Sequence, residues 1–355
     1  MFDKFLIMKL SWWKILGILI LIYVIIGGLC IPLNPGVTEI NPSQLNPGIN
    51  REVTIKGYNT HFYSGKPTRI WMKDKSGKFL EATSVIVRDE NNIVCQWDIS
   101  PSMVGKEYTL IGHNSLDGSF LVPDAFVVLK RSSELDTMDI TASFVAVNTA
   151  ELTKPGGIRF PYRSILNETI RNTFFHVALW MAMFVLYLLG LYHAIMYLRT
   201  GKKEHDWWSM AYNKSGILYG ILGLITGSLW ARFTWGGWWT NDVKLNMAAL
   251  SMFIYFGYLL LRNSFQDEEA RARISAAFSI FAFVALIPLV FVIPRLTDSL
   301  HPGNGGNPAL GGEDLDHTLR LFFYPSIIGL TLIGIWMAQL KVRVQKLASR
   351  SGIFM

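Results

Sequence analysis

The stretch Trp235-Gly-Gly-Trp-Trp-Thr-Asn-Asp242 places three tryptophans within five residues, between two hydrophobic segments that each approach the length of a membrane span. Indole rings stack on flat conjugated molecules and settle at the boundary between lipid and water. The glycines allow the backbone to turn tightly. The stretch therefore predicts a site for a planar aromatic ligand at a membrane surface. An interfacial aromatic belt that only seats the helices is the alternative reading.

Composition also indicates a membrane protein, because 51% of the residues are hydrophobic and only 17% are charged. Six runs with few or no charges approach the ~20 residues that a spanning helix needs. These runs cover residues 15–33, 173–198, 215–231, 245–261, 274–294 and 321–340. We therefore expect an all-α polytopic membrane protein with six transmembrane helices, the first run being a retained anchor and not a signal peptide.

Orientation follows from the basic residues. If the N-terminus is cytoplasmic, the inner segments carry fourteen Lys and Arg, whereas the short outer loops carry only Arg232, Lys244 and Arg295. Cytoplasmic loops are enriched in Lys and Arg, so both termini are expected inside and the tryptophan-rich loop outside. The net charge of +7 is then mostly a topology signal. It implies contact with membrane lipid and no nucleic-acid partner.

Residues 34–168 lie between the first and second spans and are long enough for a core of their own. Strand-like runs separated by turn residues occur at 52–55, 68–72, 82–87, 93–97, 108–111 and 125–129. They predict an inserted all-β sandwich on the outer side. Its opening, Asn41-Pro-Ser-Gln-Leu-Asn-Pro-Gly48 followed by residues 53–58, resembles immunoglobulin-like domains of the IPT/TIG type.

Four parts are thus expected along the chain. Residues 1–33 form a cytoplasmic tip and the first transmembrane helix, and residues 34–168 form the periplasmic β-sandwich domain and a connector. Residues 169–345 form a five-helix membrane domain that contains the tryptophan-rich loop 226–246, and residues 346–355 form a cytoplasmic tail.

Catalytic and nucleotide-binding patterns are not found. The two cysteines, Cys30 and Cys95, occur in unrelated contexts and are expected to stay unpaired. The glycine cluster at 303–306 lacks the ending of a phosphate-binding loop. We therefore expect a protein that is not an enzyme.

Histidines at the outer side are the best candidate ligands. His176 opens the second span and shares a helix face with Trp180, while His301 and His317 precede the last span. Two imidazoles on opposite faces of a macrocycle commonly hold haem iron. For each histidine alone, a satisfied polar residue is the alternative. His193, deep in the second span, is interpreted as a helix–helix hydrogen-bonding residue, and His205 lies among cytoplasmic charges.

The stretch from Thr226 to Asn246 resembles the tryptophan-rich "WWD" signature of CcmC, the haem-handling family of cytochrome c maturation. The resemblance spans about residues 165–345 and implies haem b as the bound group. The axial ligands that it implies are His176 and His301, the latter in a matching Leu-His-x-Gly context, with His317 kept as a substitute. It further implies a platform of Trp235, Trp238, Trp239 and Asp242, and Arg232 or Lys244 as partners of the propionates unless these two only anchor the interface.

The function implied by this resemblance is delivery. Haem would be bound at the periplasmic face of the bacterial inner membrane and passed to the periplasmic haem chaperone CcmE. The transporter subunits CcmA and CcmB and the small subunit CcmD would complete the complex. Asn241 replaces a fourth tryptophan, and the long β segment is unusual for the family. The alternatives are a CcsA-type cytochrome c synthesis protein and a membrane-anchored sensor or binding protein that acts through its β domain.

Overall fold

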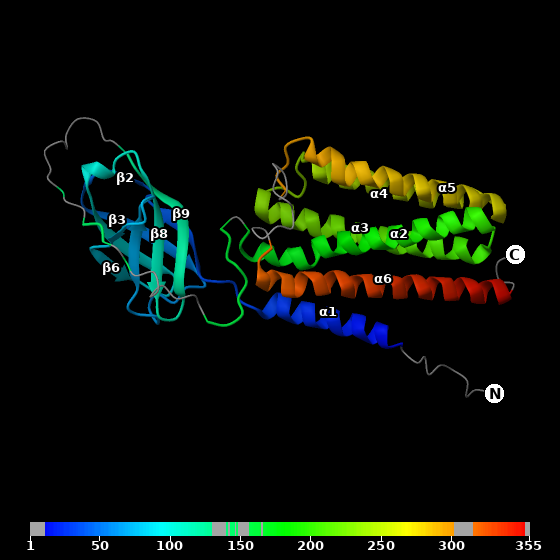
Figure 1. Ribbon diagram of the computed structural model, residues 1–355, viewed down its shortest axis with the longest axis horizontal. Coiled ribbons are helices and arrows are strands. Elements are labelled where there is room, and N and C mark those ends of the chain that lie inside the picture. The colour runs from blue at the N-terminus through cyan, green and yellow to red at the C-terminus, as the bar shows by residue number, and fades with distance from the viewer. Residues whose placement is uncertain are drawn as a thin grey trace. The chain divides into compact units, whose positions relative to one another are not determined.

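The structure is a computed structural model that describes residues 11–129, 140, 143–145, 147, 156–164, 166–301 and 315–351. It divides into two compact units, one formed by Met1–Cys30 with Glu168–Met355 and the other by Ile31–Asn167 (Figure 1). The predicted N-terminal tip before residue 11, much of the connector, residues 302–314 of the last outer loop and the final four residues of the tail lie outside the described part.

Six helices of the helical unit are long and apolar enough to cross a membrane, within the residues described. They are α1 (Trp12–Cys30), α2 (His176–Thr200), α3 (Lys203–Trp235), α4 (Val243–Asn263), α5 (Glu268–Ile287) and α6 (His317–Ser351). The prediction of six transmembrane helices is confirmed, and the chain is a multi-pass membrane protein. A short 3-10 segment, η3 (Asn167–Phe174), leads into α2.

Two helices depart from the hydrophobic runs. Helix α3 extends beyond its hydrophobic run at 215–231 and begins at Lys203, and its Asp206 is paired in the interior with Arg262 on α4. The fifth predicted run, residues 274–294, is not α-helical to its end. Helix α5 stops at Ile287 and continues as a π-helical segment, η4 (Pro288–Val292), and a 3-10 turn, η5 (Ile293–Arg295). Pro288 lacks the N–H that a regular helix needs there.

Small residues bring α2 and α3 together. A Cβ atom at Gly216 would lie 2.4 Å from Cε1 of Tyr187, so only glycine allows this approach. The Tyr187 ring in turn stacks on Tyr255 of α4, with centroids 3.6 Å apart. Close packing through small residues is the usual way in which membrane helices associate. It sets the first turn of α2 beside the last turns of α3.

Polar residues also join these two helices at their other end. His193 of α2 and His205 of α3 lie with their Nδ1 atoms 2.9 Å apart, so one ring donates to the other. The interpretation of His193 as a helix–helix hydrogen-bonding residue is confirmed. Helix α1 lies along α6, where Tyr23 stacks on Phe322 with ring centroids 4.9 Å apart (Figure 1).

The other unit is a β domain of two sheets, as predicted. Its strands are β1 (Gly36–Asn41), β2 (Gln44–Leu45), β3 (Gly48–Tyr58), β4 (Arg69–Lys73), β5 (Phe79–Glu81), β6 (Ser84–Val87), β7 (Asn92–Ile99), β8 (Glu107–Asn114) and β9 (Gly118–Val128), with the 3-10 turn η1 (Pro101–Met103) before β8. The sheet orders are β1-β3-β7-β6 and β2-β9-β8-β4-β5. Every predicted strand run overlaps an observed strand. The three strands not predicted lie at sheet edges, and two of them are very short.

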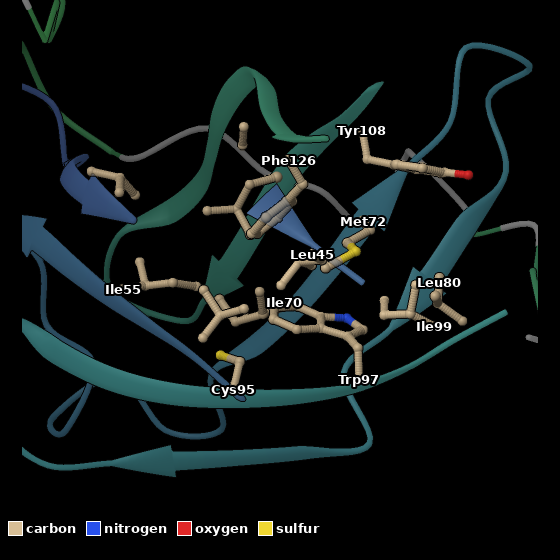
Figure 2. Packing of buried hydrophobic residues seen from close by; sticks show 14 of the residues in the cluster. Leu45, Ile55, Ile70, Met72, Leu80, Cys95, Trp97, Ile99, Tyr108 and Phe126 are labelled. Carbon is tan, nitrogen blue, oxygen red and sulfur yellow. The ribbon is translucent and has the colours of Figure 1, made fainter. Parts of the chain in front are cut away.

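The interiors of the two sheets meet in one hydrophobic core (Figure 2). Trp97 of β7 and Phe126 of β9 make an edge contact there, with ring centroids 5.6 Å apart. Cys95 is buried in this core, and both cysteines are free thiols. The resemblance to immunoglobulin-like domains stays a prediction.

Candidate functional site at the tryptophan-rich loop

Local chemistry fixes both ends of the tryptophan-rich loop. Helix α3 ends at Trp235 because Gly236 adopts a left-handed conformation with φ of 80°. Helix α4 begins after Asp242, whose carboxylate accepts the N–H groups of Lys244 at 2.8 Å and Leu245 at 3.4 Å. A side-chain acceptor at this position satisfies the free donors of a helix start. The loop therefore lies between two spans, as the sequence predicted.

Asp242 also organises the segment before residue 302. Its Oδ2 atom accepts the hydroxyl of Ser299 and the N–H of Leu300, each at 2.8 Å. Its Oδ1 atom lies 3.0 Å from Nδ1 of His301. The carboxylate is 1% exposed and His301 is 17% exposed. Because Nδ1–H donates to the carboxylate, Nε2 keeps its lone pair for another partner.

The charges of this pair follow from their surroundings. Burial raises the pKa of the Asp242 carboxyl, but the hydrogen bonds from Ser299 and Leu300 and the nearby His301 outweigh it, so the pKa lies below its ordinary value. Burial lowers the pKa of His301, and the opposing effect of Asp242 does not restore it. At neutral pH the pair is therefore a carboxylate and a neutral imidazole, which is the form that binds metals.

His176 has a different partner for the same ring nitrogen. As the first residue of α2, it lies with Nδ1 3.0 Å from the carbonyl oxygen of Gly223 and 3.2 Å from Oγ1 of Thr226, both on α3. Gly227 leaves room for the ring, since a Cβ atom there would lie 2.6 Å from Cε1 of His176. Among the described residues, no hydrogen bond engages Nε2 of His176 or of His301.

Both imidazoles line one cavity at this end of the helical unit. Cofactor pockets are usually lined mostly by apolar and aromatic side chains, with a few polar groups that orient the ligand. The other lining residues are mostly apolar: Trp180, Met181, Phe184, Gly223, Leu224, Gly227, Ser228, Trp239, Lys244, Leu245, Ala248, Val290, Phe291 and Pro294. Of the predicted site residues, the structure thus brings His176, His301, Trp239 and Lys244 together.

The remaining predicted residues lie around this cavity without lining it. Trp235 packs edge-on against His301, with ring centroids 4.8 Å apart, and Asp242 holds the same imidazole. Trp238 is 59% exposed. Arg232 donates to the carbonyl of Gly236 at the end of α3. His317, which sequence analysis kept as a substitute ligand, is exposed in the first turn of α6 and is not part of the lining.

Several residues at or beside the cavity were not among the predicted site residues. The Trp230 ring lies 6.5 Å from the ring of His176 and 5.8 Å from that of His301, by centroids, and so stands beside both. Its position in the tryptophan-rich stretch was a usable signal. Trp180, likewise, shares the helix face of His176. Phe291 and Pro294 come from the π-helical and 3-10 segments, for which Pro288 was the only sequence signal.

The donor set is chemically selective. A bare transition-metal ion is usually held by three or four protein ligands. Among the described residues, no three His, Cys, Asp or Glu side chains gather as a possible metal site. Two imidazoles in an apolar, aromatic-walled cavity instead suit a group that brings its own equatorial ligands. Haem, whose iron takes axial imidazoles, is such a group.

Comparisons with known proteins point to one family. Residues 135–353, which are more than half of the chain, match the family model described as CcmC, heme exporter protein C. Heme exporter protein C of Haemophilus influenzae is 26% identical over 132 residues, covering 37% of this chain and 53% of that protein. Its namesake in Escherichia coli K12 is 25% identical over 128 residues, covering 36% and 50%. The namesake in Bradyrhizobium diazoefficiens is 27% identical over 173 residues, covering 46% and 62%.

The alignment to the first two of these relatives spans about half of their length. The family match begins after β9, the last strand of the β domain, and includes all helices except α1. The β strands therefore lie outside the region that defines the family.

Proposed function

We propose, because this chain belongs to the heme exporter protein C family, that it binds haem between His176 and His301 and passes it on for the assembly of c-type cytochromes. The observation that carries the proposal is the pair of imidazoles on one cavity, each with Nδ1 engaged and Nε2 available. Hydrogen bonding at one ring nitrogen orients the other toward a metal. The role is transport of haem b, without chemical conversion of it by this chain.

The walls support a planar occupant. Trp239 lines the cavity, and its Nε1 donates to Oδ1 of Asn246 at 3.2 Å, which fixes the indole orientation. Phe184 and Phe291 meet at 4.9 Å between ring centroids on another part of the lining. Aromatic rings pack well against the faces and edges of a porphyrin. Among the described residues, Lys244 is the cation in the cavity lining, so we assign the propionates to it before Arg232.

Binding from two differently supported ligands suits a protein that must release its cargo. His176 is held by helix backbone and a threonine hydroxyl, whereas His301 belongs to a loop that is held by Asp242. Replacement of His301 by a group of the acceptor would transfer that ligand position to the acceptor while His176 still binds the haem. Trp235 and Trp230 pack beside His301 and would keep its ring near the iron until that exchange.

The direction of transport rests on the basic residues. The Lys and Arg distribution supports the bacterial inner membrane with both termini in the cytoplasm, so the cavity end would face the periplasm. The acceptor is then a periplasmic haem chaperone, CcmE, and the ATP-binding transporter pair CcmA and CcmB with the small subunit CcmD would drive release.

An absorption spectrum of the purified protein from haem-replete cells tests the function. The wild type should show a Soret band, and His176→Ala and His301→Ala should each lose most of it because either change removes an axial ligand. His317→Ala is the matched control and should keep it. Colourless wild-type protein would contradict haem binding, and loss of the band in His317→Ala with retention in His301→Ala would overturn the ligand assignment.

Orientation is tested separately by labelling in a background with Cys30→Ser and Cys95→Ser. A cysteine at the exposed position Ser43 should react with a membrane-impermeant maleimide on cells stripped of their outer membrane. A cysteine at Lys202, between α2 and α3, should react only after lysis. The reverse pattern would show that the termini are outside.

A further inference from the structure

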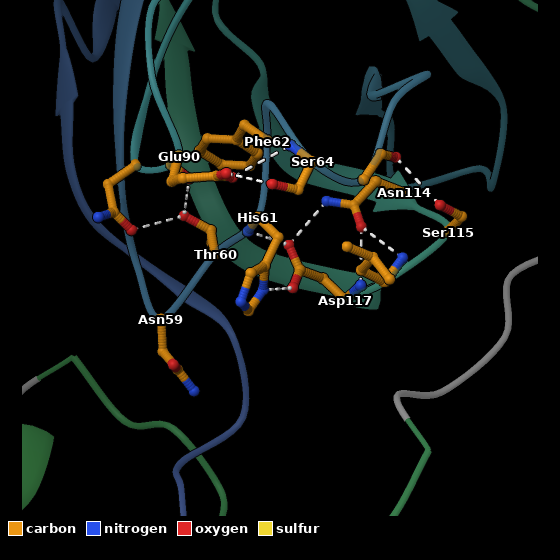
Figure 3. A network of polar contacts seen from close by, with 12 residues as sticks. Asn59, Thr60, His61, Phe62, Ser64, Glu90, Asn114, Ser115 and Asp117 are labelled. Atoms are coloured by element: carbon orange, nitrogen blue, oxygen red, sulfur yellow. Dashed lines mark hydrogen bonds and ion pairs between the residues drawn. The ribbon is translucent and has the colours of Figure 1, made fainter.

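A second oriented histidine lies in the β domain. His61 follows β3, and its Nδ1 atom is 2.7 Å from Oδ1 of Asp117, in the turn between β8 and β9 (Figure 3). The side chain of Asp117 is fully buried, whereas that of His61 is 42% exposed. Because Nδ1 is engaged, Nε2 of the exposed ring keeps its lone pair. Among the described residues, no hydrogen bond engages that nitrogen.

The carboxylate that holds His61 is itself fixed. Oδ2 of Asp117 accepts the backbone N–H of His61 and an amide hydrogen of Asn114, each at 2.7 Å. Oδ1 of Asn114 accepts the N–H groups of Leu116 and Asp117, so the turn is rigid (Figure 3). Asn114 is also fully buried. A saturated, buried carboxylate under an exposed imidazole sets both the tautomer and the direction of the ring.

This arrangement repeats that of Asp242 and His301. In both pairs the carboxylate is at most 1% exposed. It accepts hydrogen bonds from Nδ1 of the imidazole and from a backbone N–H of the histidine or of the residue before it. If the contact between Asp117 and His61 served only to join two loops, Nε2 of His61 would not need to remain available. Orientation of an imidazole by a buried carboxylate is the common support of metal-ligating histidines.

The surroundings of His61 suit haem more than a bare cation. A zinc-type ion needs three or four protein ligands, and no such group occurs among the described residues. Haem iron needs only one proximal imidazole. Tyr63, two residues along, is 58% exposed and carries the Lys66 ammonium 4.2 Å from its ring centroid. The same short loop thus offers an imidazole, an exposed aromatic ring and a cation that can pair with a propionate.

This loop is held in place from a third side. Glu90, in the turn between β6 and β7, accepts the N–H group of Tyr63 at 3.2 Å. It also accepts the N–H group of Ser64 at 3.2 Å and the Ser64 hydroxyl (Figure 3). Tyr63 is therefore kept close to His61 by backbone contacts that do not use its ring, and the Lys66 ammonium lies over that ring.

We propose that His61 is a further haem ligand, and that the β domain holds haem through this one imidazole with Tyr63 and Lys66 beside it. The inference rests on the proposed function in that haem is taken to be the cargo. It assigns a task to a domain whose strands β1 to β9 lie outside the region matched by the family model. A single axial ligand holds haem less firmly than two, which suits a transient position.

The test uses the full-length protein in nanodiscs and ferric haem (haemin) as the probe, with empty nanodiscs subtracted. The cavity site is first removed with His176→Ala and His301→Ala together. This double variant should still bind one haemin per chain saturably, and adding His61→Ala should abolish that binding. Adding His113→Ala instead is the matched control, since His113 is a β-domain histidine whose Nδ1 lies 3.0 Å from a serine hydroxyl, that of Ser119. It should change nothing.

Ligand rescue separates ligation from a loss of folding. With His61→Gly in the double variant, free imidazole should restore the Soret spectrum because it can occupy the vacated axial position. A double variant without saturable haemin binding, equal binding with and without His61, or no rescue by imidazole would overturn the proposal. The function proposed above fails independently, if wild-type protein binds no more haemin than the double variant does.

Discussion

An aspartate is buried at each end of the helical bundle, but the two aspartates have different partners. At one end Asp206 of α3 meets the Arg262 guanidinium of α4 in a two-pronged pair, with N–O distances of 2.7 and 2.6 Å and side-chain exposures of 9% and 8%. At the other end Asp242 engages only one nitrogen of His301. The first pair neutralises both charges and joins α3 to α4. The second leaves a ring nitrogen with its lone pair beside a cavity, so the mode of pairing, and not burial, distinguishes the proposed ligand site.

Breaking the first pair should have the largest effect. Arg262→Met leaves the Asp206 charge buried without its partner, and such a loss typically costs about 3–5 kcal/mol. We expect a strongly lowered midpoint of thermal unfolding in detergent and reduced abundance in the membrane. The double variant Asp206→Leu with Arg262→Met should recover most of the stability, because it removes both charges. A stable single variant would show that this end does not depend on its ion pair.

The second pair should respond in haem affinity and not in folding. Asp242→Asn keeps a helix cap of equal quality but no longer holds His301 in the required tautomer. Loss of such a supporting carboxylate typically weakens metal binding by about 10–100-fold. Haem titration at neutral pH measures the loss, and circular dichroism should be unchanged. Unaltered affinity would show that Asp242 serves only as a cap.

The same variant also tests the direction in which Asp242 shifts the pKa of His301. Haem held by His301 is released when that imidazole is protonated, and burial places its pKa below the ordinary value. The Asp242 carboxylate favours the protonated ring and so raises this pKa. Its removal should therefore lower the pKa of the His301 imidazole in the haem-free protein, which an NMR titration of that ring measures. A pKa of His301 that rises in Asp242→Asn would contradict the assignment of charges.

Crowding at His176 tests the other ligand. Gly227→Ala would place a Cβ atom 2.6 Å from Cε1 of His176, so the ring must shift. Overpacking of this kind usually costs about 1–3 kcal/mol, and we expect haem affinity to fall about tenfold, which is ~1.4 kcal/mol. Gly237→Ala is the matched control, because the nearest atom to its Cβ would be at 3.5 Å. Equal affinities in the two variants would place haem away from His176.

The smallest effect should separate two neighbouring tryptophans. Trp239 lines the cavity, while Trp238 is 59% exposed outside it. Trp239→Ala should lower haem retention several-fold, since an aromatic contact contributes on the order of 1 kcal/mol beyond the buried area. Trp239→Phe should lie between that variant and the wild type, and Trp238→Ala should stay close to the wild type. Equal haem in all four proteins at equal membrane abundance would favour the aromatic-belt interpretation.

Parts of the site that depend on local sequence were predictable. The tryptophan-rich loop between two spans and the placement of His176 at a helix start follow from hydrophobic length and turn chemistry. The contact of Asp242 with His301 bridges 59 positions in sequence. Likewise, the π-helical segment that supplies Phe291 to the wall depends on how a proline is accommodated against neighbouring helices. Neither could be read from spacing.

Taken by itself, the sequence determined the membrane class, the six spans and the longer inner strands of the inserted β domain, because hydrophobic periodicity and chain length act locally. Only the tertiary structure decided that Trp239 lines the cavity while Trp238 does not, that Trp230 stands beside both imidazoles, and that a buried carboxylate orients His61. These outcomes depend on which side chains meet across separate elements. That choice is made by packing and hydrogen-bond satisfaction over long range, for which a sequence pattern carries no direct signal.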